Sequence, residues 1–106
     1  MPKFLYHGSY TAGGAEGILK EGGSARVKAA TELIESVGGT LEALYWTLGH
    51  HDFVLIADMP DQAAAAAVSL KAGASGTLRA TTTPLLTAAD VDEIAKRGAT
   101  YRPPGQ

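Results

Sequence analysis

Two neighbouring strand-like segments, residues 40–48 and 52–59, carry apolar side chains on both of their faces. Successive side chains of a strand point in opposite directions. The second segment therefore has Phe53, Leu55 and Ala57 on one face and Val54 and Ile56 on the other, and the first has Leu41, Ala43 and Tyr45 against Leu44, Trp46 and Leu48. A sheet with helices on one side and water on the other needs only one apolar face. We therefore expect the centre of this sheet to be covered on both faces.

The remaining strands are indicated by local composition. Residues 3–10 are rich in aromatic side chains and residues 76–85 in threonine, so each segment is predicted to be a strand. The linker Gly49-His50-His51 is short and contains glycine, which is typical of a hairpin between the two strands that it joins. Residues 12–23 contain five glycines and predict at most a short, weak helix.

Three further helices are predicted from apolar spacing and from capping residues. Ser24 is expected to cap a helix that ends at Gly38-Gly39. One face of that helix carries Val27, Ala30, Ile34 and Val37. Asp61 is expected to cap an alanine-rich helix over residues 62–73. Thr87 and Asp90 have the spacing of a capping box, which predicts a last helix that ends near Arg97.

These elements follow one another in the order β-α-β-β-α-β, with one further helix at the C-terminus. Two right-handed β-α-β crossovers give an antiparallel sheet with strand order 4-1-3-2 and with the helices on one face. The predicted fold class is therefore α+β, of the ferredoxin-like type. We expect a single domain over residues 1–98 and an extended tail over residues 99–106.

Charge and composition argue against several classes of partner and site. The 9 basic and 11 acidic residues are mixed along the chain and give a net charge of -2, whereas a nucleic-acid-binding protein normally has a basic stripe. No segment approaches the ~18 apolar residues that a membrane span needs. Neither nucleic acid nor membrane is therefore an expected partner. With no cysteine the chain has no disulfide and no thiolate metal site, and the cytoplasm is the expected location. The sequence also contains no motif for a cofactor, so none is expected.

The second apolar face of the sheet needs something to cover it, because a contiguous exposed apolar patch marks a site for a partner or a ligand. One interpretation is self-association, with a second copy of the chain packed on this face. The other is that the C-terminal helix folds across the sheet and covers the patch internally. A single short helix is narrower than a four-stranded sheet, which favours a homodimer or a higher even-numbered oligomer.

Several short motifs between Lys3 and about Val91 form a specific combination. They are Ser9-Tyr10-Thr11 at the end of the first strand, Gly38-Gly39 before the second, Gly49-His50-His51-Asp52 in the hairpin, Pro60-Asp61 before the alanine-rich helix, and Gly76-x-x-Arg79-x-Thr81-Thr82 in the last strand. Together they resemble the GYD-domain family, a group of small and mostly uncharacterised bacterial proteins. The naming motif of that family has a tyrosine where this chain has His51. The resemblance implies the dimeric α/β-barrel arrangement, in which two ferredoxin-like sheets pack face to face around a cavity.

The His50-His51-Asp52 segment has three possible roles. In the first, it is only a turn, in which Asp52 accepts hydrogen bonds from turn amides and Gly49 adopts a positive φ. In the second, His51 and Asp52 bind a ligand or take part in catalysis. In the third, the imidazoles bind a metal, although adjacent residues of a strand point apart and no third ligand stands at a telling spacing.

His7 and Arg79 are expected to be near neighbours, because the first strand lies antiparallel to the fourth in the predicted sheet. A guanidinium and an imidazole in an apolar cavity would hold an anionic or enol-type ligand. Alternatively, the two side chains line a polar part of a dimer interface. Tyr45 and Trp46 lie near the hairpin and are large enough to anchor either an interface or a ligand.

These observations lead to three functional hypotheses. The first is a homo-oligomeric module that binds a small ligand or another protein in a cavity on the exposed sheet face. The second is a cofactor-independent oxygenase or isomerase, in which His7 or His51 is a general base and Arg79 stabilises negative charge. The third is a metal-binding protein that uses its histidines. The residues proposed for ligand binding are His7, Tyr45, Trp46, His51, Asp52 and Arg79.

Overall fold

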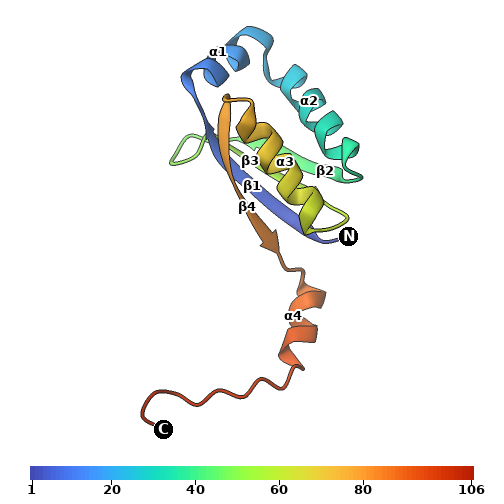
Figure 1. Cartoon of the computed structure of the whole chain (residues 1–106), viewed down its shortest axis with the longest axis vertical. Helices are drawn as coiled ribbons and strands as arrows, with labels where there is room; N and C mark the ends of the chain where they lie inside the picture. The colour runs from blue at the N-terminus through green and yellow to red at the C-terminus, as the bar shows by residue number, and fades with distance from the viewer.

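The computed structural model describes residues 1–106 and contains four strands and four helices (Figure 1). In chain order they are β1 (Lys3–Tyr10), α1 (Ala12–Glu21), α2 (Gly23–Ser36), β2 (Thr40–Trp46), β3 (Phe53–Asp58), α3 (Gln62–Ala74), β4 (Leu78–Leu85) and α4 (Ala88–Ala95). The predicted order of elements is confirmed. No helix combines the length and the apolar character that crossing a membrane requires.

The four strands form one antiparallel sheet in the order β2-β3-β1-β4. This is the predicted order 4-1-3-2 read from the opposite edge. The two central strands, β1 and β3, pair with each other and each also pairs with an edge strand, so their backbone groups form hydrogen bonds on both sides. Both α2 and α3 lie on one face of the sheet (Figure 1). The α+β, ferredoxin-like fold is thereby confirmed.

The hydrophobic core lies between this helical face and the two helices. Its buried members come from all layers and are Phe4, Tyr6, Ile34, Phe53, Leu55, Ala57, Met59, Ala65 and Val68. Tyr6 is 3% exposed, and its hydroxyl donates a hydrogen bond of 2.8 Å to the carbonyl oxygen of Ala65 in α3. Burial raises the pKa of Tyr6 to about 12. The alternating buried and half-exposed residues of β3 follow the two-residue period of a strand with one fully covered face.

The two N-terminal helices begin differently from the prediction. The glycine-rich segment forms a regular helix of 10 residues, because the side chain of Thr11 accepts a hydrogen bond from the Gly14 amide and caps it. The next helix begins one residue before Ser24, with Gly22 at the N-cap and no side-chain cap. The prediction that Ser24 caps α2 is therefore wrong. Gly22 adopts φ +83, which lets the chain turn directly from α1 into α2.

The caps of the later helices agree with the sequence. The Asp61 carboxylate accepts a hydrogen bond of 2.8 Å from the Ala64 amide at the start of α3. Thr87 and Asp90 form both hydrogen bonds of a capping box at the start of α4, and these bonds hold the pKa of Asp90 below its ordinary value. Each cap satisfies amide groups that the first helical turn leaves without partners.

A β-bulge in β2 changes which of its side chains face the helices. Leu41 pairs with Ala57 and Ala43 with Ile56, so Glu42 is the extra residue between them. Leu41 therefore turns to the helical side and packs against the core. The prediction that Leu41 shares a face with Ala43 and Tyr45 is wrong, because a bulge shifts the alternation by one residue.

The side of the sheet that carries no helix, called the open face below, has an apolar centre. Leu5, Ala43, Tyr45, Val54 and Ile56 form this centre, as the pairings of β1, β2 and β3 require. At one end of the open face, Lys3 of β1 forms ion pairs with Glu42 of β2 and Asp58 of β3. These hydrogen bonds raise the pKa of Lys3.

The last helix does not cover the open face. α4 lies beyond the end of β4, away from the sheet, and the tail extends further from it (Figure 1). It has no buried residue, and Leu86, Val91 and Ile94 are exposed. The molecule consequently measures 58 × 32 × 22 Å. The interpretation that the C-terminal helix folds across the open face and covers it is therefore wrong.

Candidate functional site

All three histidines of the chain meet at one end of the open face. His7 of β1 stacks on His51 of the β2–β3 loop, with 4.2 Å between ring centroids and 29° between ring planes. His50 lies edge-on to His51, at a centroid distance of 5.1 Å. His7 and His51 are half-buried, whereas His50 is exposed. These three residues, called the histidine cluster below, line a shallow depression with Leu48 and Val54.

The loop that carries two of these histidines is tied to the end of β1 through Asp52. Its carboxylate accepts a hydrogen bond of 2.9 Å from the Tyr10 amide, and its own amide donates one of 2.7 Å to the Gly8 carbonyl oxygen. β3 begins opposite Gly8, so the carboxylate takes the place of a strand residue that would otherwise pair with Tyr10. Asp52 is therefore a structural partner of β1, and the prediction that it bonds amides of its own turn is wrong.

Gly49 also differs from the prediction. The glycines with positive φ are Gly22, Gly38, Gly76 and Gly105, so the hairpin loop is built without a left-handed residue at Gly49. The loop is instead closed by Thr47. Its amide donates a hydrogen bond of 2.9 Å to the Asp52 carbonyl oxygen, and its hydroxyl donates another to the His51 carbonyl oxygen. These bonds hold His51 over His7.

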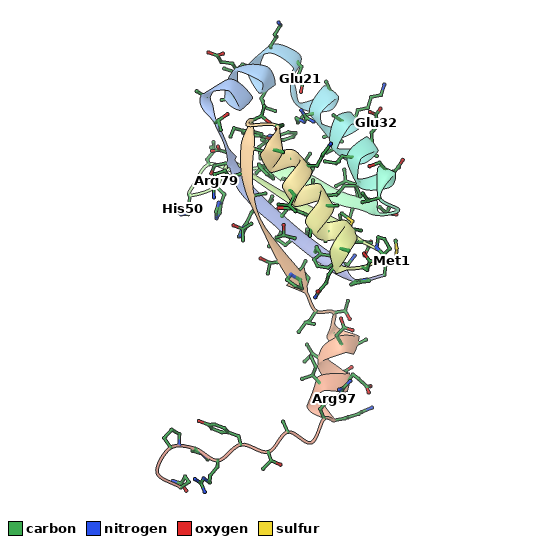
Figure 2. The ribbon with its side chains drawn as sticks, in the orientation of Figure 1. Met1, Glu21, Glu32, His50, Arg79 and Arg97 are labelled. Atoms are coloured by element: carbon green, nitrogen blue, oxygen red, sulfur yellow. The ribbon has the colours of Figure 1, made fainter.

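Arg79 lies on the same face and at the same end of the sheet as the histidine cluster. Figure 2 shows Arg79 and His50 at this end. In the register of β1 and β4, Arg79 pairs with Ser9, while His7 pairs with Thr81. Arg79 is therefore a diagonal neighbour of His7, two residues along the strand, at a Cα separation of the order of 7–8 Å. The direct ring contact of His7 is with His51 instead, which the sequence did not indicate.

The two adjacent aromatic residues of β2 go to opposite faces. Tyr45 pairs with Val54 on the open face and is 68% exposed. Trp46 pairs with Phe53 on the helical face, and its indole Nε1 donates a hydrogen bond of 2.9 Å to the Tyr10 hydroxyl. Of the six residues proposed for ligand binding, Trp46 is thus separated from the others by the sheet.

The side chains around the histidine cluster do not form a preorganised metal centre. The structure contains no group of three or more histidine, cysteine, aspartate or glutamate side chains placed to hold one metal ion. The imidazoles contact one another through their ring faces and edges, and the nearest carboxylate, that of Asp52, is directed at the Tyr10 amide. The arrangement is better suited to contacts with a planar or anionic organic group, which imidazole and guanidinium side chains bind.

A second concave region, which was not predicted from the sequence, lies on the other face of the sheet. It is a cavity of about 400 Å³ between α2 and α3, called the α2–α3 groove below. The residues that define it are Tyr6 and Phe53 on its floor, Ala30 and Leu33 of α2, and Val68 and Ala72 of α3. The available signal was the predicted strand order together with the small side chains of the helix over 62–73.

Comparisons with known proteins identify the family. No curated protein matches the sequence at a significant level. The family model described as GYD domain matches residues 4–95. The match covers every strand and helix, including α4, except for Lys3 at the start of β1, and it extends over the hairpin and the histidine cluster. The chain therefore belongs to the GYD-domain family.

Proposed function

We propose that this protein is a homo-oligomeric module that packs its open face against a second copy of itself and holds a small organic ligand between the two sheets. The observation that supports this proposal is the uncovered apolar centre of the open face. Leu5, Val54 and Ile56 lie on the two central strands, and no element of the chain packs over them. Apolar surface of this kind costs free energy in water, at roughly 25 cal/mol per Å².

A second copy is the occupant that fits this surface best. A twisted four-stranded sheet is matched in width and curvature by another sheet of the same kind, and a two-fold axis lets the same patch serve both partners. The centre is apolar, while its border carries the Lys3, Glu42 and Asp58 ion pairs at one end and the histidine cluster at the other. An apolar centre with a polar rim is typical of protein interfaces.

The ligand is proposed to lie at the end of the interface that holds the histidine cluster and Arg79. Packing a second sheet over the depression beside His7 and His51 would enclose it on the side that is now open. An enclosed site with two imidazoles, one guanidinium and apolar walls would favour a small planar or anionic molecule. Tyr45 would contribute an aromatic wall from β2.

Oligomeric state tests the proposal. Light scattering and native mass spectrometry at micromolar concentration should give a species of at least twice the 10.9 kDa of one chain, with any retained ligand as added mass. Ile56→Lys should produce a folded monomer, because it places a charge at the centre of the open face. Leu19→Lys is the matched control, since Leu19 is 87% exposed on α1 and far from the open face. A monomeric wild-type protein would refute the proposal.

A cofactor-independent oxygenase or isomerase is the second candidate function, and the stacking of His7 on His51 favours it. In this reading one imidazole removes a proton from the substrate, and Arg79 stabilises the negative charge that develops. Turnover would be sought among aromatic and enolisable acids. If the site is catalytic, His7→Gln and Arg79→Ala should each leave the oligomer intact and abolish turnover. If His7 and Arg79 only line the dimer interface, His7→Gln should preserve both assembly and ligand affinity, and Arg79→Ala should weaken assembly.

A further inference from the structure

The α2–α3 groove exists because the two helices lie over opposite edges of the sheet. α2 packs against the edge strand β2 and α3 against the other edge strand, β4 (Figure 1). Three strand spacings of ~4.8 Å separate these edges by ~14 Å. Helices in direct contact lie only ~8–10 Å apart. The two helices therefore leave a strip of the central strands β1 and β3 between them.

Side chains cover most of this strip, since Tyr6, Phe53 and Leu55 are each less than 9% exposed, but they leave a cavity between the helices. The positions that face it from the helices include Ala30 of α2 and Ala72 of α3, whose methyl groups are too short to meet across it. The floor is made by Tyr6, Phe53 and Leu55, and 12 of the 17 lining residues are hydrophobic. A cavity of about 400 Å³ is at the lower end of the ~300–1,000 Å³ range of small-molecule sites. The width excludes a helix, which needs ~10 Å, and suits a single hydrocarbon chain or a small ring.

The polar side chains of the groove point to the charge of its ligand. Arg26 of α2 and Lys71 of α3 are both lining residues, whereas no aspartate or glutamate lines the groove. Arg26 has one acidic contact, Glu21, at 3.3 Å, and both side chains of that pair are well exposed. Such a surface ion pair is weak and can yield to an incoming anion. The groove thus combines apolar walls with two cations.

Tyr10 supplies a hydrogen-bond donor in the same groove. Its hydroxyl oxygen accepts the bond from Trp46 Nε1, while its own proton has no acceptor within the protein. Burial raises the pKa of Tyr10, so the phenol keeps this proton at neutral pH. An oxygen atom of a ligand would accept a hydrogen bond from this hydroxyl.

We propose that the α2–α3 groove binds a small monocarboxylic acid with an apolar body. The apolar part lies on Tyr6, Phe53 and Leu55, and the carboxylate meets Arg26, Lys71 and the Tyr10 hydroxyl. This site is on the opposite side of the sheet from the proposed dimer interface. It does not depend on the proposed function, and the two can fail separately.

The test uses decanoate as the probe and decanol as its uncharged counterpart. Trp46 is the single tryptophan and bonds directly to Tyr10, so its fluorescence reports occupation of the groove. Decanoate should bind saturably and change this fluorescence, and decanol should bind at least ~10-fold more weakly, a loss equivalent to ~1.4 kcal/mol. Equal binding of the two compounds, or no binding of decanoate, would overturn the proposal.

Two pairs of variants locate the binding. Ala72→Phe fills the groove and should abolish the fluorescence response, whereas Ala67→Phe, the same change on the exposed side of α3, should not alter it. Ala30→Phe fills the groove from α2 and serves if Ala72→Phe does not fold. Arg26→Gln should weaken decanoate by ~5–10-fold and leave decanol unchanged, with Lys28→Gln on the exposed side of α2 as its control. Unchanged decanoate binding in a folded Ala72→Phe or Ala30→Phe variant would refute the site.

Discussion

Asp52→Ala should destabilise the fold although the residue lies beside a surface loop. The substitution removes the acceptor that holds the Tyr10 amide at 2.9 Å, and no strand residue is available to replace it. A hydrogen bond to a charged group contributes ~1.5–3 kcal/mol, and Asp52 is only half-buried, so we expect a loss of about 2 kcal/mol. Unfolding entropy of ~2.1 cal/mol/K per residue converts this value into a fall in Tm of about 9 °C for a chain of this length.

Thermal unfolding followed by circular dichroism measures this change. Asp52→Asn keeps an oxygen acceptor at the same position and should lose less than half as much stability as the alanine variant. Asp92→Ala is the matched control, because Asp92 is exposed on α4. His50→Ala should be nearly silent, since His50 is exposed and contacts only the edge of His51. An Asp52→Ala variant with a Tm within about 2 °C of the wild type would refute the role of the carboxylate as a substitute strand partner.

Three further substitutions test the packing of the sheet and of α3. Gly8→Ala should destabilise the fold by about 1–3 kcal/mol or more, as overpacking does, because its Cβ would lie 2.0 Å from the Arg79 carbonyl oxygen. Gly73→Ala in α3, where nothing lies within 4 Å of the added Cβ, should instead stabilise the fold by about 0.5–1 kcal/mol; urea denaturation measures both changes. Tyr6→Phe should cost about 1 kcal/mol at neutral pH through the lost bond to Ala65. Because the pKa of Tyr6 rises from 10.0 to about 12 on folding, the wild type should lose stability as pH rises through this interval. If the Tyr6→Phe variant lost stability equally steeply over the same interval, the pH dependence would not come from Tyr6.

The sequence predicted the fold well because its local signals agreed with one another. The hairpin linker and the caps at Asp61 and Thr87 each act within a few residues, and the crossover rule then limits the strand order. One of the errors arose where a single residue decides the register of a strand. Glu42 adds a bulge that turns Leu41 to the core, and no local signal distinguishes it from its neighbours.

The candidate site was predicted only in part, for the same reason. His7 and Arg79 were predicted to be near neighbours, and His51 was proposed as a ligand-binding residue of the hairpin. The side chain that contacts His7 is decided by the conformation of the hairpin loop and by the register of β1 and β4. Trp46 was assigned to this site, yet strand alternation sends it to the other face. The α2–α3 groove depends on the distance between two helices, which the strand order and the small side chains of α3 indicate only in combination.

The projection of α4 away from the sheet determines how this protein moves in solution. The Cα radius of gyration is 17.0 Å, whereas a compact chain of this length would have ~13 Å. An elongated particle experiences more friction than a sphere of equal mass, so it diffuses and sediments more slowly. A monomer with this shape would leave a gel-filtration column early, near the position of a heavier compact standard. The mass of this chain in solution is therefore measured correctly only by methods that do not assume a shape.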